Sequence, residues 1–284
     1  MKLFKELPTI LPFYTNIKNQ DRFKENVKSI CPADLISPSD SLLPFMLQIP
    51  KDSPKPDSWK LFDLNGNEVA DLTNNLNQIK AFNFEDFAFA YYNGQKLTFK
   101  FEEYESDLDL SGRFYTILEI AGQKYFSETF LMCKEIKTDS FSDRFVKIVF
   151  SDETDVFPLR YRNGFKQVLY LDTFIHQSEP EIEEETEEDG FGNQITVFQK
   201  MIIRQRIAVV VPDFLKIAIL TLQMHDNVEI FEKNKRSGKI DRIKVSSAIE
   251  DFGALSSLDL LFESDVLLKT NCNDNKAIIS EIWN

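Results

Sequence analysis

The sequence of 284 residues contains two histidines, His176 and His225, that could transfer protons or bind a metal ion. Neither belongs to an H-x-x-x-H or H-E-x-x-H arrangement, which would place two ligands on one face of a helix. His225 stands beside Asp226 in Met-His-Asp-Asn, between a predicted helix and a predicted strand. Isolated polar groups in such turns usually satisfy local hydrogen bonds. We therefore interpret His225 as a structural residue.

The sequence contains neither of the glycine-rich motifs that bind phosphate, the P-loop and G-x-G-x-x-G, and it lacks G-x-S-x-G, which exposes a nucleophilic serine. The nearest glycine-rich segment, Gly190-Phe191-Gly192, follows an acidic tract whose charge repels phosphate. The 46 acidic residues offer many carboxylate pairs for glycoside hydrolysis, but a sugar cleft usually also carries several tryptophans and this chain has two. Because no triad, metal site or cofactor loop can be assembled, we expect a protein that is not an enzyme and takes no cofactor.

The acidic tract runs from Glu179 to Gly190 and lacks apolar periodicity. We interpret it first as an exposed loop whose charge keeps subunits from stacking wrongly. Contact with a basic partner and calcium binding are the alternatives, although no loop of the EF-hand type is present. As partner-contact residues we select members of this loop and two phenylalanines of the N-terminal segment: Glu183, Glu184, Glu185, Glu187, Glu188, Asp189, Phe13 and Phe23.

The formal net charge of -13 argues against two classes of partner. An acidic chain is repelled by the phosphates of nucleic acids and by anionic membrane surfaces, so we expect no nucleic-acid partner and no membrane partner. The hydrophobic fraction of 43% is enough for a substantial core, and the 26 phenylalanines suit sheet interiors and subunit interfaces. The charge fits solubility or contact with a basic protein.

The three cysteines, Cys31, Cys133 and Cys272, have no zinc-type spacing, and three thiols cannot all pair within one chain. We expect them to be reduced thiols of a protein made in a cytoplasm. The first residues lack the apolar run of a signal peptide. No apolar stretch approaches the roughly 20 residues of a membrane-spanning helix.

Glycine positions predict an antiparallel β protein. Three Asn-Gly pairs lie between alternating or apolar segments, and Asn-Gly suits a type I′ hairpin turn. Gly122 lies in a similar position, after a period-two segment over 113–120 that continues through 124–133. Proline suits the first turn of a helix, so Pro212 predicts a short helix over 214–222 that follows a long strand over 196–211. Around the Asn-Gly pairs we predict hairpins of 58–64 with 67–72, of 87–92 with 95–101, and within 157–172.

These patterns predict a mostly β fold in three parts. Residues 1–36 form an N-terminal arm, which is either a short amphipathic helix or a segment that orders only against a neighbour. Residues 37–138 form an immunoglobulin-like or fibronectin-like β-sandwich. Residues 139–284 form a second antiparallel β domain, which contains one short helix and the acidic loop 179–190.

Two segments of the first half stand out, LISPSDSLLPF at 35–45 and the strand at 112–115 followed by GQKYFSETF at 122–130. The first is similar to the opening, and the second to the paired strand-and-turn element, of a group of virion proteins encoded by phages and prophages of Bacteroidota hosts. The resemblance implies a structural component of the tail, baseplate or neck and brings no catalytic residues. Further similar segments recur in the same order at 161–165, 169–172, 179–190, 198–200 and 222–230.

We therefore expect a structural subunit of a bacteriophage particle, made in the host cytoplasm and located in the virion. It would contact copies of itself and other virion proteins in a homo-oligomeric ring, where each weak contact is repeated. The alternative is a tail-tip module that recognises a host-surface receptor or glycan. An exposed aromatic platform would favour that alternative, but the aromatic residues fall mostly on alternating strand positions that predict a core role.

Overall fold

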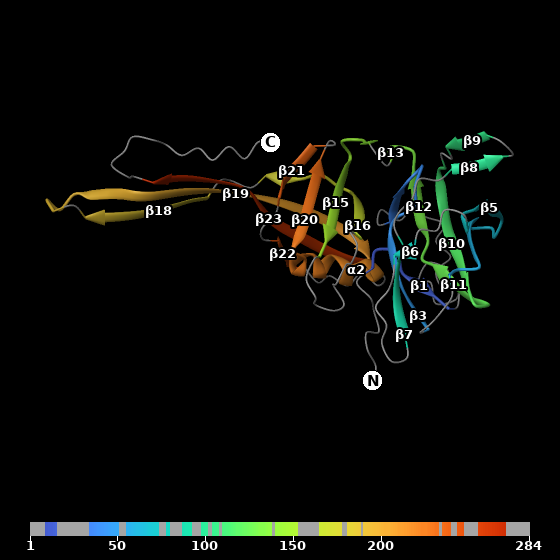
Figure 1. The fold of residues 1–284 in the computed structure, drawn as a ribbon. Helices are drawn as coiled ribbons and strands as arrows, with labels where there is room; N and C mark the ends of the chain where they lie inside the picture. The colour runs from blue at the N-terminus through green and yellow to red at the C-terminus, as the bar shows by residue number, and fades with distance from the viewer. Residues whose placement is uncertain are drawn as a thin grey trace.

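The chain folds into β-strands with one short α-helix among the described residues, which confirms the mostly β prediction. A body of crossed strands lies at one end of the molecule, and a long narrow sheet projects from it (Figure 1). None of the helices in the described part of the chain has the length and apolarity to cross a membrane. The computed structural model describes residues 9–15, 34–50, 55–73, 78–79, 87–92, 98–101, 104–107, 110–137, 140–152, 165–177, 181–188, 190–232, 235–239, 243–246 and 255–270.

An 11-stranded sheet forms the centre of the body. Every strand pair in it is antiparallel except β12 with β2, which is parallel. Strand β4 (Ser58–Asp63) pairs with β10 and carries β5 (Glu68–Asp71) on its other edge. The remaining strands follow one path, in the order β1 (Phe13–Tyr14), β11 (Gln123–Ser127), β10 (Gly112–Ile120), β12 (Phe130–Cys133), β2 (Ile36–Pro38), β16 (Gln167–Asp172), β15 (Phe145–Ser151), β20 (Asn227–Glu232) and β21 (Lys235–Lys239).

Four smaller sheets surround this one. A five-stranded sheet contains the two longest described strands, and parts of β18, β19 and β23 form the projection in Figure 1. Its members are β17 (His176–Gln177), β18 (Glu181–Glu188), β19 (Gln194–Pro212), β23 (Leu255–Thr270) and β22 (Ile243–Ser246). The others are β3 (Phe45–Pro50) with β7 (Phe87–Tyr92) and β6 (Gln78–Ile79), β8 (Thr98–Phe101) with β9 (Tyr104–Asp107), and β13 (Ile136–Lys137) with β14 (Ser140–Phe141).

Strand β2 joins the two halves of the chain. Its Ile36 is the register partner of Leu131 on β12 and of Tyr170 on β16. One sheet therefore contains strands from both sides of the boundary expected at residues 138–139. The buried side chains also form one hydrophobic cluster, which includes Trp59 from the first part and Phe150 from the second. The immunoglobulin-like or fibronectin-like strand order is not confirmed, whereas the mostly β class is.

The hairpin of β10 and β11 confirms the prediction around Gly122. Ile120 pairs with Gln123, so Ala121 and Gly122 are the two turn residues. Both have positive φ, 50° and 77°, as a type I′ turn requires. The strand predicted over 124–133 is interrupted at Glu128, and β11 and β12 pair with successive parts of β10.

The hairpin of β4 and β5 is also confirmed, but its turn differs from the expected type I′. Gly66 has a φ of 84°, while Asn65 is not among the residues with positive φ. The loop is longer than two residues because Asp63 Oδ1 accepts hydrogen bonds from the backbone N–H groups of Asn65 and Asn67, at 2.9 and 2.8 Å. A carboxylate that binds backbone groups two residues on competes with the tighter turn.

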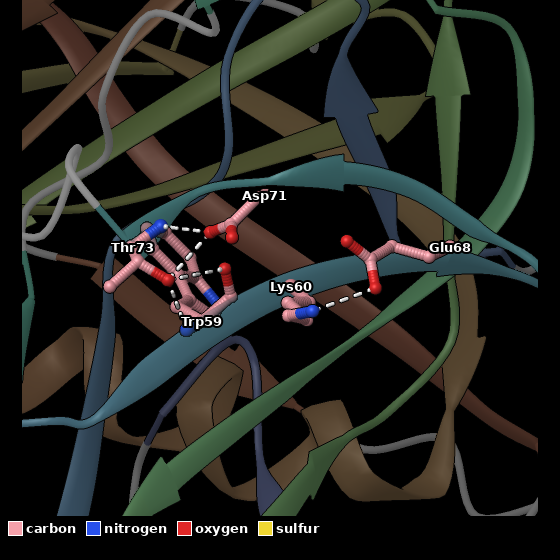
Figure 2. Close-up of polar contacts among 5 residues, drawn as sticks. All are labelled: Trp59, Lys60, Glu68, Asp71 and Thr73. Carbon is pink, nitrogen blue, oxygen red and sulfur yellow. Dashed lines mark hydrogen bonds and ion pairs between the residues drawn. The ribbon is translucent and has the colours of Figure 1, made fainter.

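The far end of the same hairpin is closed by one hydroxyl group (Figure 2). Thr73 Oγ1 donates a 2.6 Å hydrogen bond to Asp71 Oδ1 and accepts one of 3.0 Å from the backbone N–H of Trp59. On the exposed face, Lys60 and Glu68 form a 2.8 Å ion pair between the two strands. Trp59, whose indole is buried in the core, therefore lies at the end of the hairpin that Thr73 closes.

The predicted pairing of 87–92 with 95–101 is wrong. Strand β7 pairs with β3 along its length, and its last residues also pair with β6 on the other edge. A two-residue hairpin at Asn93-Gly94 would need an unpaired edge of β7, but described strands pair with both edges. Strand β8 pairs with β9 instead. For the hairpin predicted within 157–172, the second arm forms β16 and pairs with β15. Residues 153–164, which include the expected turn, lie outside the described residues.

Residues 9–15 are built into the body and do not form a detached arm. Ile10 and Leu11 are buried in the main cluster. Gln167 Oε1 accepts a 2.9 Å hydrogen bond from the backbone N–H of Ile10, and Thr9 Oγ1 accepts one of 3.3 Å from that of Met46. Strand β1 then pairs with β11. The arm expected over 1–36 is thus wrong for these residues, because long-range partners that the local sequence does not reveal hold them.

The helix predicted after Pro212 is confirmed as α2 (Asp213–Leu220), and one turn of 3₁₀ helix, η3 (Thr221–Met224), follows it. Pro212 occupies the N-cap with a φ of -57°. The buried side chains Leu215, Ala218 and Ile219 recur at helical spacing, and α2 lies close to both β19 and β23. The helix therefore anchors the base of the projecting strands.

Candidate functional site: a projecting β-sheet

Three strands leave the body together as one narrow sheet (Figure 1). Strand β18 pairs antiparallel with β19 from Glu181↔Ile202 to Glu188↔Gln194. Strand β23 covers the opposite edge of β19, beginning at Phe198↔Thr270. We call residues 181–188, 190–203 and 263–270 the projecting sheet.

Where the projecting sheet meets the body, one face of β19 and of β23 is buried against the core. Along β19, Gln205, Ile207 and Val211 are buried, while Arg204 and Arg206 are exposed. On β23, Leu258, Leu260 and Phe262 lie in the hydrophobic cluster. This alternation is the pattern of a strand with one face on the core. The body thus fixes the direction in which β19 and β23 leave it.

The acidic tract is a strand, so the expected loop over 179–190 is wrong for residues 181–188. Glutamate is depleted in strands, and composition alone therefore favours a loop. The partner decides otherwise, because β19 is 19 residues long and offers a continuous edge for pairing. The register shifts between Glu185 and Thr186, which marks a β-bulge.

Five of the selected partner-contact residues lie together on β18. Glu184, Glu185, Glu187 and Glu188 are exposed, and Glu183 is the register partner of Lys200 on β19. Gln199 Nε2 donates a 2.5 Å hydrogen bond to Glu184 Oε1. The strand therefore gives its edge of the projecting sheet a strong negative charge. Of the other selected residues, Asp189 and Phe23 lie outside the described residues.

The tip of the β18–β19 hairpin carries an exposed aromatic side chain that is not among the contact residues expected from the sequence. Phe191 is 94% exposed, between Gly190 and Gly192, and Gly192 has a φ of 79°. Nearer the body on β18, Ile182 is 61% exposed. The signal for Phe191 is its place between two turn glycines, because a hairpin tip leaves a side chain largely exposed to solvent.

Phe13 lies far from this site, within the body. It is half-buried, and its ring centroid lies 4.5 Å from that of the fully buried Phe45. Strand β1 places it opposite Ser127 of β11. The structure therefore brings the selected glutamates together and separates Phe13 from them.

The two histidines occupy different environments. His176 is exposed at the base of the projecting sheet, opposite Arg206, with its ring centroid 4.4 Å from that of the exposed Phe174. His225 is buried, with Nδ1 3.6 Å from Asp152 Oδ2. Burial is the main cause that lowers the pKa of His225, to about 4, and the charge of Asp152 acts in the opposite direction.

Among the described residues, no group of three or more His, Cys, Asp or Glu side chains has an arrangement that could hold a metal ion. The glutamates of β18 are spread along a strand, whereas a calcium site needs oxygen ligands that converge on one point.

No family model, no curated protein and no solved structure matches this chain.

Proposed function

We propose that this chain is a structural subunit of a bacteriophage particle, in the tail or baseplate, that works through protein–protein assembly contacts. The observation that supports it most is the projecting sheet, which extends beyond the core of its own chain (Figure 1). Such a sheet exposes strand edges and apolar side chains that a neighbouring subunit can cover. The resemblance of residues 35–45 and 112–130 to virion proteins supports placing that neighbour in a phage particle.

The partners in this proposal are copies of the chain itself and other virion proteins. Phe191 and Ile182 offer apolar contacts at 94% and 61% exposure, and aromatic side chains often supply most of the energy of an interface. The glutamates of β18 favour a partner with positive charge at the matching positions. Repetition of the contact around a ring would make a weak interface effective.

The test is deletion of the gene from a phage or prophage that encodes the chain, followed by electron microscopy of the particles. We expect incomplete tails or baseplates, and restoration of complete particles by the wild-type gene. Complete, infectious particles without the chain would contradict the proposal. Complete particles that fail to adsorb to the host would favour the receptor-binding alternative.

Complementation with a tip variant tests the part assigned to the projecting sheet. We expect Phe191→Ser to give a folded protein that restores assembly poorly. Leu64→Ser is the matched control, because Leu64 is 46% exposed on the β4–β5 hairpin at the other end of the molecule. Equal restoration by both variants would show that the tip makes no essential contact.

A further inference from the structure

The two long edges of the projecting sheet differ in chemistry. The β18 edge carries glutamate at six of its eight positions. On the β23 edge, β22 pairs with residues 259–262, and no described strand pairs with that edge from Glu263 to Thr270. An open edge presents backbone N–H and C=O groups that favour the addition of another strand.

We propose that this open edge of β23 pairs with the same edge of a second copy of the chain. The two β23 strands would run antiparallel about a two-fold axis at Leu267, so that two projecting sheets become one continuous six-stranded sheet. A two-fold interface uses the same surface on both copies and must therefore be self-complementary. The inference deepens the assembly function proposed above and rests on it for its biological setting.

The sequence of β23 is self-complementary in this register. Asp265 would lie opposite Lys269 of the second copy, and the symmetry supplies the same pair again on the other side of the axis. Val266 would lie opposite Leu268, and Leu267 opposite its own counterpart. Opposite charges and apolar pairs at directly opposite positions each stabilise an antiparallel pair of strands.

Neighbouring registers fit less well. An axis at Val266 would set Glu263 opposite Lys269, but it would place Asp265 opposite Leu267 and Ser264 opposite Leu268. An axis at Leu268 would place Leu267 opposite Lys269. Each of these registers sets a charge against an apolar residue, which strand pairing disfavours. The axis at Leu267 therefore fits the charge pattern best.

The β18 edge is unsuited to the same role. Pairing of β18 with another β18 would bring glutamates opposite glutamates, and like charges opposite one another destabilise a strand pair. Pairing of β18 with β23 of another copy would set glutamates against the Val266-Leu267-Leu268 run. Charge thus disfavours strand addition at one edge, while no described strand covers the other edge from Glu263 to Thr270, which limits growth of the joined sheet to two copies.

The existing register continues across the proposed axis. Ile182 pairs with Met201, and Met201 pairs with Leu267, so these three residues form one row across the sheet. The second copy would extend this row with the same three residues in reverse order. Such a row of apolar positions across six strands would give the joined sheet a stripe that neither copy completes alone.

A disulfide experiment tests the register directly. In a chain whose three cysteines are replaced by serine, we expect Leu267→Cys to form an intermolecular disulfide on mild oxidation, because the axis places residue 267 opposite itself. Ser264→Cys is the matched control, since its two copies would lie six residues apart along the strands, about 20 Å. Equal cross-linking of the two variants, or a failure of Leu267→Cys to cross-link, would overturn the register.

A charge-swap series in the chain with its native cysteines provides an independent test, read by mass photometry over a concentration series. We expect Asp265→Lys and Lys269→Asp each to weaken the dimer about tenfold or more, because each puts like charges opposite one another twice per interface. The double variant should return to within about threefold of the wild type. A double variant as weak as the single ones, or a wild type that stays monomeric at high concentration, would overturn the pairing.

The two proposals fail in different ways. If Asp265→Lys enters phage particles at the normal copy number, the edge pairing is overturned while the structural role in the particle stands. If the wild-type protein forms the predicted dimer but gene deletion leaves complete particles, the pairing stands and the phage role is overturned.

Discussion

His225 Nδ1 lies 3.6 Å from Asp152 Oδ2, and both side chains are withdrawn from solvent. The ring of Phe150 lies on the imidazole, with a centroid separation of 4.9 Å. Desolvation disfavours the charged imidazolium more than Asp152 favours it, so the pKa of His225 is lowered to about 4. The folded protein therefore keeps His225 neutral at pH 7.

This relationship predicts that stability decreases in mild acid. The unfolded chain binds a proton at His225 with the ordinary pKa of 6.5, whereas the folded chain binds it only near pH 4. The free energy of unfolding should therefore fall as the pH drops from about 6.5 towards 4, by up to about 3 kcal/mol from this residue. Urea unfolding at several pH values measures it.

Substitution separates His225 from other acid effects. His225→Gln should remove this component, so that the wild type and the variant differ in the slope of stability against pH below about 6.5. His176→Gln is the control, because it removes the exposed histidine. Parallel slopes for wild type and His225→Gln would contradict the prediction.

Truncation of a buried side chain near the N-terminus tests whether residues 9–15 belong to the core. Ile10 is fully buried, and its backbone N–H is bound by Gln167. Ile10→Ala should lower the free energy of unfolding by about 2–5 kcal/mol, because it leaves a cavity in the main cluster. Thr15→Ala, at an exposed position of the same segment, should change it by less than about 0.5 kcal/mol. Similar small effects of both would mean that the segment is detached in solution.

Removal of one hydroxyl should loosen the β4–β5 hairpin. Thr73→Val keeps the shape of the side chain but leaves the backbone N–H of Trp59 without the acceptor seen in Figure 2. We expect a loss of about 1–3 kcal/mol in the free energy of unfolding. Thr73→Ser retains the hydroxyl and should lose much less, as thermal or urea unfolding would show.

The same contacts give this effect a pH dependence. Hydrogen bonds from the side chain and backbone of Thr73 lower the pKa of Asp71. Stability from a carboxylate with a lowered pKa is present above its ordinary pKa and is lost as the pH falls through its folded value. The difference between wild type and Thr73→Val should therefore shrink in acid. A difference that grows in acid would contradict this account.

The turn between β10 and β11 offers a stabilising substitution. Ala121 has a φ of 50°, in the left-handed region that costs an alanine about 1–2 kcal/mol. Asparagine tolerates this region better and precedes glycine in many type I′ turns. We expect Ala121→Asn to raise the free energy of unfolding by about 0.5–1 kcal/mol. Gly122→Ala should lower the free energy of unfolding, because alanine is strained at a φ of 77°. A steric clash would not contribute, because an added Cβ would meet no atom within 4 Å. A destabilised Ala121→Asn variant would contradict the turn geometry.

Local patterns predicted the parts of the fold that local interactions control. The period-two segment over 113–120 and the glycine after it were enough to predict the β10–β11 hairpin. Pro212 and the apolar spacing after it were enough to predict α2, because a cap and a periodic face lie within a few residues. The glutamates proposed as a contact site were also found by composition, and the structure places them together on β18.

The errors share a different cause. Asn93-Gly94 suggested a hairpin of adjacent segments, but residues from β3 and β6 occupy both edges of β7. The N-terminal prolines suggested an arm, but the backbone N–H of Ile10 donates a hydrogen bond to Gln167, which is 157 residues away in the sequence. Pairing between distant residues depends on the whole arrangement and has no local signature.

The sequence by itself determined a mostly β chain, its acidic character and the places where the chain turns, because these follow from composition, alternation and turn chemistry over short distances. The tertiary structure alone decided that residues 181–188 are a strand and that no described strand pairs with the outer edge of β23 from Glu263 to Thr270. The tertiary structure also decided that Ile10 is buried in the main hydrophobic cluster. The physical reason is that a strand edge, a buried face and an exposed tip are defined by which distant segment lies beside them.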